Sequence, residues 1–268
     1  ISIKLWGMGV DGTALATVIS QGVSGVICFF YMKKRFTVLQ MSREERRPDG
    51  AKMKRLCYMG IPMGLQYSIT AIGSILLQTA VNGLGAVSMA AVAASGKVTN
   101  LFATPYDAMG TMAATYAGQN LGAGKLDRVH HGVKDCCILG VAYSLAALVV
   151  MYFLGAQMTA LFLDSKDVAS SAQILPLARQ LLVTNAAFYI PLLGVNLFRF
   201  TIQGLGYSNL AVIAGVFEMI ARGAVAAMVS VFGFTAVCYA SPAAWVLADC
   251  FLLPAYFVCM KRRTKEAA

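Results

Sequence analysis

Charged side chains are scarce in this chain of 268 residues. They make up 13% of it, against roughly 25% in soluble domains. Acidic residues are the scarcest, with 12 Asp and Glu against 22 Lys and Arg. Apolar residues contribute 58%, and the mean hydropathy is +0.68. This composition excludes an ordinary soluble domain.

Side chains for metal or nucleophilic chemistry are equally sparse. Histidine occurs only twice, as the neighbours His130 and His131, and no HExxH motif contains them. The seven cysteines form no CxxC pair, so they indicate no zinc site and no disulfide framework. The spacing from Gly118 to Lys125 approaches a Walker motif, but Leu126 stands where that motif requires a hydroxyl. We therefore expect no cofactor, no metal and no enzymatic activity.

What the chain does contain is seven apolar stretches of membrane-spanning length. Because a bilayer core offers no water to the backbone, stretches of about 20 apolar residues can cross it only as helices. We predict an all-α integral membrane protein with seven transmembrane helices, at residues 12–32, 56–81, 87–117, 136–153, 174–202, 210–232 and 237–260. The third and fifth are longer than needed and contain Pro105 and Pro191, so we expect them to tilt or kink.

Basic residues alternate between the loops. They cluster at 33–55, at 125–134 and at 261–265, whereas the intervening loops contain only Lys166. This is the positive-inside pattern, and it predicts a multi-pass protein of the plasma membrane with a cytoplasmic C-terminus. Since topology already accounts for the basic run at 33–55, we expect no nucleic-acid partner.

Two of the apolar stretches end in nearly the same basic sequence. Residues 32–35 read MKKR and residues 260–263 read MKRR, six helices apart. A six-helix period within seven spans predicts that the chain, which starts with Ile1, is a fragment of a duplicated protein. We expect 1–32 to be the last helix of an N-terminal lobe, 33–55 an interlobe linker, 56–263 a six-helix C-terminal lobe, and 264–268 a cytoplasmic tail.

Four short motifs follow one another along the chain. Residues 9–21 read GVDGTALATVISQ, residues 60–66 read GIPMGLQ, residues 118–125 read GQNLGAGK and residues 203–206 read QGLG. Glycines in the third motif permit a tight turn at a helix end, and we expect Asp127 to cap the next helix. With these motifs the chain resembles the multidrug and toxic compound extrusion (MATE) transporters.

The resemblance implies a twelve-helix, two-lobe antiporter, of which this chain supplies the sixth helix and the second lobe. It implies a secondary active exporter that exchanges H⁺ or Na⁺ for organic, often cationic, compounds by alternating access. The partners implied are small organic substrates, the lipid bilayer and the missing N-terminal lobe. Many relatives carry a glutamate where this chain has Thr70 and an aspartate near Leu192, and a subset relies on an aspartate in the first helix, outside this chain. The coupling ion therefore stays open.

Polar residues within the predicted spans are the site candidates, because such residues are costly in a bilayer. Each of the third and fifth helices carries a stripe of them, spaced for one face: Lys97, Asn100, Thr104, Asp107 and Thr111, and Asn185, Tyr189, Asn196, Arg199 and Gln203. The stripes line a wet cavity or hold helices together. Gln66 is a further cavity candidate. Asp249, alone in the last helix, is a proton site or a hydrogen-bonding group, and Glu218 and Arg222 form a structural pair four residues apart.

Two other functions fit parts of the sequence. A lipid-linked oligosaccharide flippase of the same superfamily would present cations such as Lys97, Arg199 and Arg222 to an anionic headgroup. A seven-helix receptor is more remote, because the last helix has no lysine for a Schiff base and the six-helix repeat favours a transporter.

Overall fold

The computed structural model describes residues 10–36, 48–163 and 168–267, and within these ranges every regular element is an α-helix. The chain divides into two compact units, Ile1–Lys54 and Arg55–Ala268, which are described separately. Gly9 of the first motif, the basic residues Arg43, Arg46 and Arg47, and Lys166 lie outside the described residues.

The first unit is built around α2 (Val10–Arg35). Its span from Ala14 to Arg35 is apolar enough to cross a membrane. The basic residues Lys33, Lys34 and Arg35 occupy its last turn, where positive charge favours the carbonyl end of the helix dipole. The basic sequence that ends the first predicted span is thus part of the helix itself.

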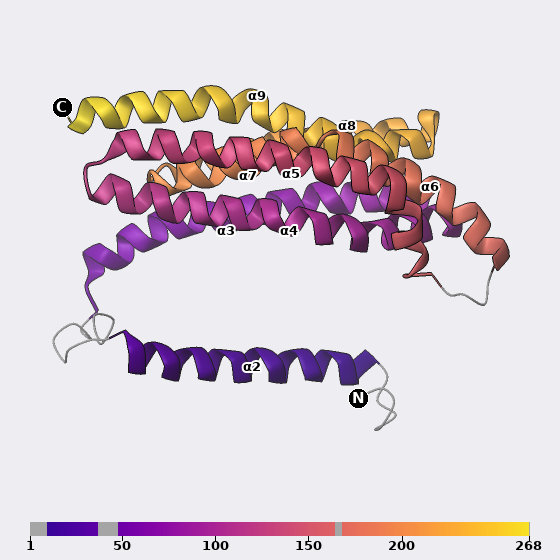
Figure 1. Cartoon of the computed structure of the whole chain (residues 1–268), viewed down its shortest axis with the longest axis horizontal. Coiled ribbons are helices and arrows are strands. Elements are labelled where there is room, and N and C mark those ends of the chain that lie inside the picture. The colour runs from indigo at the N-terminus through magenta and orange to yellow at the C-terminus, as the bar shows by residue number, and fades with distance from the viewer. Residues whose placement is uncertain (1–9, 37–47, 164–167, 268) are drawn as a thin grey trace. The chain divides into compact units, whose positions relative to one another are not determined.

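The second unit contains the remaining helices, shown in Figure 1. They are α3 (Gly50–Asn82, from Arg55 onward), α4 (Ala86–Gly122), α5 (Leu126–Ala160), α6 (Val168–Ala187), α7 (Tyr189–Gly204), α8 (Ser208–Phe232) and α9 (Phe234–Ala267). With α2, six of the described helices are long and apolar enough to span a membrane, and α6 with α7 makes a seventh, broken span. The predicted all-helical architecture is confirmed. The helices extend beyond the predicted spans. α5 has 35 residues and is therefore about 52 Å long, whereas the hydrocarbon core of a bilayer is about 30 Å thick.

The broken span lies where the sequence predicts a kink. α6 and α7 are bent by 53° about Phe188, three residues before Pro191. Proline has no amide hydrogen, so Pro191 cannot donate to the carbonyl of Ala187, and its ring crowds that carbonyl. The kink expected at Pro191 is confirmed, whereas α4 continues as one helix through Pro105.

The core of this unit surrounds α7, which contacts α4, α5, α8 and α9. From Leu192 to Leu197 every residue of α7 is buried. Small residues allow close packing: Gly204 faces the backbone of Ala114 on α4, and Gly140 of α5 faces Leu193. Lipid tails are as apolar as a protein core, so close van der Waals packing of this kind is what holds membrane helices together.

The turns after α4 and α7 share one hydrogen-bond pattern. In the first, the amide of Lys125 donates to the carbonyl of Asn120 at 2.8 Å, and in the second Tyr207 donates to Ile202 at 3.1 Å. Each turn contains a glycine with positive φ, Gly124 at 67° and Gly206 at 91°, as this type of helix end requires. The sequence motifs at 118–125 and 203–206 are thus two copies of one helix-ending turn.

The expectation that Asp127 caps α5 is wrong. The N-cap position is Lys125, and no side chain caps it. Asp127 lies in the first turn instead, where its negative charge still favours the helix dipole.

Candidate functional site

The polar stripe of α4 lies on an exposed face of the second unit. Its members are all exposed: Lys97, Asn100, Thr104, Asp107 and Thr111. The hydroxyl of Thr104 donates to the carbonyl of Asn100, and that of Thr111 to Asp107, both at 2.8 Å. The opposite face of α4 packs inward through Tyr106, whose hydroxyl lies 2.8 Å from that of Ser144. The stripe therefore points away from the core of the lobe.

The two charges of the α4 stripe have different surroundings. The ammonium of Lys97 lies 5.4 Å from the ring centroid of Phe162, a cation–π contact. The Asp107 carboxylate has no hydrogen bond or ion pair within the described part of the chain, and it interacts electrostatically with Arg199. Asp107 is therefore the charged residue of the stripe whose side chain is left without a direct partner in the described part of the chain.

The stripe predicted for the fifth span lies inside the lobe. Asn185, Tyr189, Asn196, Arg199 and Gln203 are all buried. The amide nitrogen of Gln203 donates to the side-chain oxygen of Gln66 at 2.8 Å, which joins α7 to α3. Asn196 donates to the carbonyl of Leu192 on its own helix at 3.1 Å. Gln203 thus makes a contact between helices, whereas Oδ1 of Asn185 and the hydroxyl of Tyr189 have no hydrogen-bond partner in the described part of the chain.

Glu218 stands at the centre of a buried charged triad. Arg199 donates a hydrogen bond to one of its carboxylate oxygens, and Arg222 lies 3.2 Å from the other. The exposed fractions are 7% for Arg199, 2% for Glu218 and 9% for Arg222. The sequence predicts only the pair four residues apart on α8, because Arg199 comes from another helix. The triad has a net charge of +1.

Asp249 of α9 lies against the backbone of α7. A side-chain carbon on Gly194 would overlap the Asp249 carboxylate, so only glycine admits this contact. One carboxylate oxygen is buried without a hydrogen-bond partner in the described structure. Asp249 also interacts electrostatically with Arg199. The excess positive charge of the triad is therefore flanked by two carboxylates, those of Asp107 and Asp249.

The positions where relatives are expected to carry acids are neutral here. Thr70 points toward α8, with its hydroxyl close to Gly215 and without a hydrogen-bond partner in the described part of the chain. Leu192 is buried in the hydrophobic core. The sequence identifies Asp249 as a polar residue in the last span but does not place it. The structure shows it next to Gly194, two residues from Leu192.

The residues considered for metal binding are not assembled into a site. Nδ1 of His130 lies 3.4 Å from the hydroxyl of Tyr256, on α9. Across residues 10–36, 48–163 and 168–267, no three His, Cys, Asp or Glu side chains are grouped to hold a metal ion.

Comparison with known proteins agrees with this helical architecture. The chain is 27% identical over 205 residues to the probable multidrug resistance protein YpnP of Bacillus subtilis, covering 76% of this chain and 43% of that protein. It is 24% identical over 163 residues to the probable multidrug resistance protein YoeA of the same organism, covering 60% and 35%. The chain thus spans less than half the length of these two relatives.

Solved structures share the fold. The crystal structure of MATE in complex with MaL6 matches with a TM-score of 0.89 and 19% identity, over 99% of this chain and 60% of that one. The family model described as MatE matches residues 62–242. Since that match covers more than half of the sequence, the chain belongs to the MATE family of membrane transporters.

Proposed function

We propose that this chain is the C-terminal part of a secondary active exporter that exchanges H⁺ or Na⁺ for organic, often cationic, compounds by alternating access. The observation that carries the proposal is the exposed polar face of α4, with the uncommitted carboxylate of Asp107. Charged groups in membrane helices face a cavity or a partner, because exposure to lipid is costly. The α4 stripe then lines a wet cavity beside the second lobe.

The charges favour a cationic substrate. Arg199 and Arg222 are buried and form ion pairs with Glu218, and the ammonium of Lys97 lies over the ring of Phe162. Of the three cations that a flippase would offer to an anionic headgroup, only Lys97 is thus exposed on the α4 stripe, where it packs on an aromatic ring beside the open Asp107 carboxylate. The exporter is therefore favoured over the lipid-linked oligosaccharide flippase. The names of the two Bacillus relatives, both probable multidrug resistance proteins, point in the same direction.

Ion coupling in this lobe is assigned to Asp107 and Asp249. Both interact with the excess positive charge at Arg199, and both lie in membrane-spanning helices. A carboxylate that binds either the substrate cation or the coupling ion makes the two ligands exclude each other, which is the requirement for exchange. Thr70 and Leu192, the positions where relatives carry acids, offer no such group.

The organisation follows that of two-lobe transporters. Residues 1–32 are the last helix of the N-terminal lobe, 33–55 the linker, and 56–263 the second lobe, with the C-terminus in the cytoplasm. Rocking of two such lobes about a central site exposes it to each side in turn.

The proposal is tested by ethidium efflux from cells that express the full-length protein. Asp107→Asn keeps the size of the side chain and removes its charge, so we expect export of cationic compounds to fall at least tenfold at unchanged expression. Asp127→Asn, at an exposed position in the first turn of α5, is the matched control and should export normally. Normal efflux by Asp107→Asn would contradict the assignment. Loss of lipid-linked intermediates without any efflux phenotype would support the flippase instead.

A further inference from the structure

Arg179 is an exposed cation on α6, within the broken membrane span. One face of α6 packs through Ile174 and Ala178 against Ala91 of α4. Arg179 lies outside that contact, and its guanidinium lies 5.5 Å from the ring centroid of Tyr152 on α5. It has no hydrogen bond or ion pair in the described part of the chain. Because a charge exposed to lipid is costly, Arg179 needs a partner from outside the second unit.

A hollow of about 330 Å³ opens beside this guanidinium. Its lining residues come from α5 and α6 and are Tyr152, Pro176, Arg179, Gln180 and Val183. The amide nitrogen of Gln180 donates to the hydroxyl of Thr235 on α9 at 3.5 Å. The exposed face of α6 therefore lies between α5 and α9, away from the α4 stripe.

The hollow lies at the level where the predicted spans end. Tyr152 is one residue before the end of the span at 136–153, and Thr235 is two residues before the span at 237–260. The basic segment at 125–134 is at the other end of α5. Tyrosine and arginine both suit the border between hydrocarbon and headgroups, where the ring contacts acyl chains and the guanidinium reaches phosphate.

An apolar strip continues from the hollow toward the middle of the span. Val149 and Leu145 are exposed on α5, three and seven residues before Tyr152, and so lie on the same face of the helix. Seven residues of helix measure about 10 Å. The surface thus presents a cation and then an apolar strip, in the order in which a phospholipid presents its phosphate and its acyl chains.

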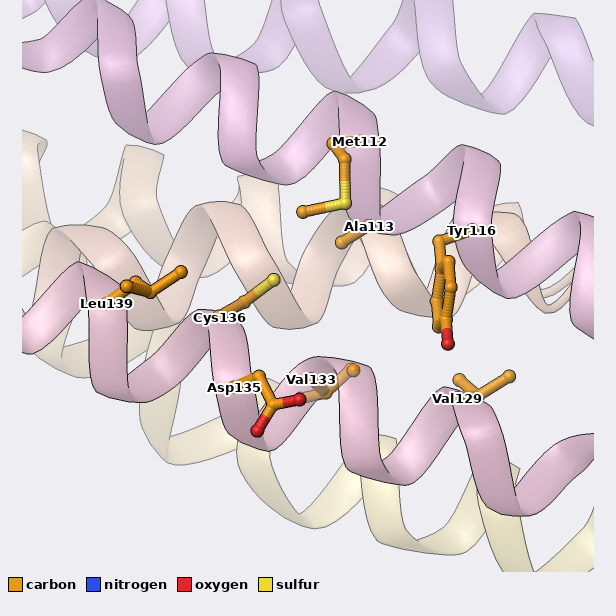
Figure 2. A pocket seen from close by; sticks show the side chains of 9 residues that line it. Met112, Ala113, Tyr116, Val129, Val133, Asp135, Cys136 and Leu139 are labelled. Carbon is orange, nitrogen blue, oxygen red and sulfur yellow. The ribbon is translucent and has the colours of Figure 1, made fainter.

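Another hollow, of about 290 Å³ between α4 and α5, lacks this combination. Figure 2 shows Met112 and Tyr116 of α4 across from Leu139 of α5, with the Asp135 carboxylate directed away from the cavity. None of the described residues that line it is basic. An acyl chain can fill this hollow, but no group there selects a headgroup.

We propose that the hollow at Arg179 binds the headgroup of an anionic phospholipid of the phosphatidylglycerol class, in the leaflet opposite the basic segments. The guanidinium donates to the phosphate oxygens, whose geometry matches its paired N–H groups, and Tyr152 holds it in place. The side-chain oxygen of Gln180 accepts from a glycerol hydroxyl. No acidic residue lines the described hollow, so the ammonium of a zwitterionic headgroup finds no partner. The site is independent of the proposed export function.

Binding is measured on the purified full-length protein in nanodiscs that contain photoreactive lipids. Phosphatidylglycerol and phosphatidylcholine, each with a diazirine in the acyl chain, are compared at equal fractions, and labelled residues are identified by mass spectrometry. We expect phosphatidylglycerol to label the strip at Val149 and Leu145 about threefold to tenfold more than phosphatidylcholine. Arg179→Gln should bring this ratio close to one. At Leu139, in the hollow without a cation, both lipids should label equally.

Two further variants separate headgroup recognition from other effects. Tyr152→Leu keeps the surface apolar but removes the ring that holds the guanidinium, so the ratio should fall by about half or more. Arg128→Gln removes an exposed arginine from the first turn of α5 and should leave the ratio unchanged.

Three results would overturn the proposal. The first is equal labelling by the two lipids at Val149 and Leu145 in the unmodified protein, or a ratio that Arg179→Gln does not lower. The second is an equal fall in Arg128→Gln, which would mean diffuse attraction of anionic lipids. The third is loss of labelling when soluble glycerol phosphate is added at the concentration of the lipid, which would mean a site for a free anion.

Discussion

Glu218→Gln tests the buried triad most directly. The substitution keeps the shape of the side chain and removes the one negative charge that two buried arginines share. Removing one partner of a buried ion pair costs about 3–5 kcal/mol, because the remaining charge stays desolvated. Since the change takes away the one carboxylate with which both Arg199 and Arg222 form ion pairs, we expect a loss of stability within that range.

Thermal unfolding in detergent, followed with a thiol-reactive fluorophore, reports this loss. Cys136, Cys238 and Cys259 are buried and free, so they react only when the lobe opens. The control is Glu266→Gln, which removes exposed ion pairs with Arg262 and Arg263. Exposed pairs contribute about 0–1 kcal/mol, so the control should unfold almost like the parent protein.

A triple variant separates charge from packing. Replacing Arg199 with Met, Glu218 with Leu and Arg222 with Met removes all three charges at similar volume, and such replacements are often neutral or stabilising. We therefore expect the triple variant to be more stable than Glu218→Gln alone. Equal unfolding temperatures for Glu218→Gln and Glu266→Gln would refute the reasoning, because the triad would then not be desolvated.

Two further predictions concern contacts of α7. Gly194→Ala places a carbon on the Asp249 carboxylate and should cost about 1–3 kcal/mol, as overpacking does; adding Asp249→Ala should recover much of that loss, and failure to do so in the same unfolding assay would contradict the contact. Arg263→Ala removes two hydrogen bonds to the carbonyl of Leu205, at 2.7 and 3.1 Å, so hydrogen exchange at the α7–α8 turn should speed up about tenfold or more. Arg262→Ala, which makes no such bond, is the control, and similar exchange in both variants would contradict the prediction.

The helical spans were predictable because hydrophobic length is a local property. The apolar stretches, the kink at Pro191 and the ion pair on α8 each depend on residues within a few turns of one another. The extended ends of helices such as α5 were not predicted, because their terminal turns carry polar residues such as His130 and His131 that resemble a loop.

The candidate site was predicted in composition but not in arrangement. The sequence identified Asp107, Arg199, Glu218 and Asp249 as polar residues in spans. It did not show that Arg199 reaches Glu218, because nineteen positions and a tight turn separate them. The hydrogen bond between Gln203 and Gln66 could likewise not be predicted from the sequence, since the two residues lie on helices far apart in the chain. Side-chain pairing across helices depends on packing, which leaves no periodic signal.

By itself the sequence determined that this chain crosses a membrane as helices, where they begin and end within a few turns, and which family it resembles. The tertiary structure decided which polar stripe is buried. The stripes on the third and fifth predicted spans have similar spacing and polarity, yet one lies on an exposed face of α4 and the other lies inside the lobe around α7. The physical reason is that burial is set by neighbouring helices, and α7 packs against α4, α5, α8 and α9.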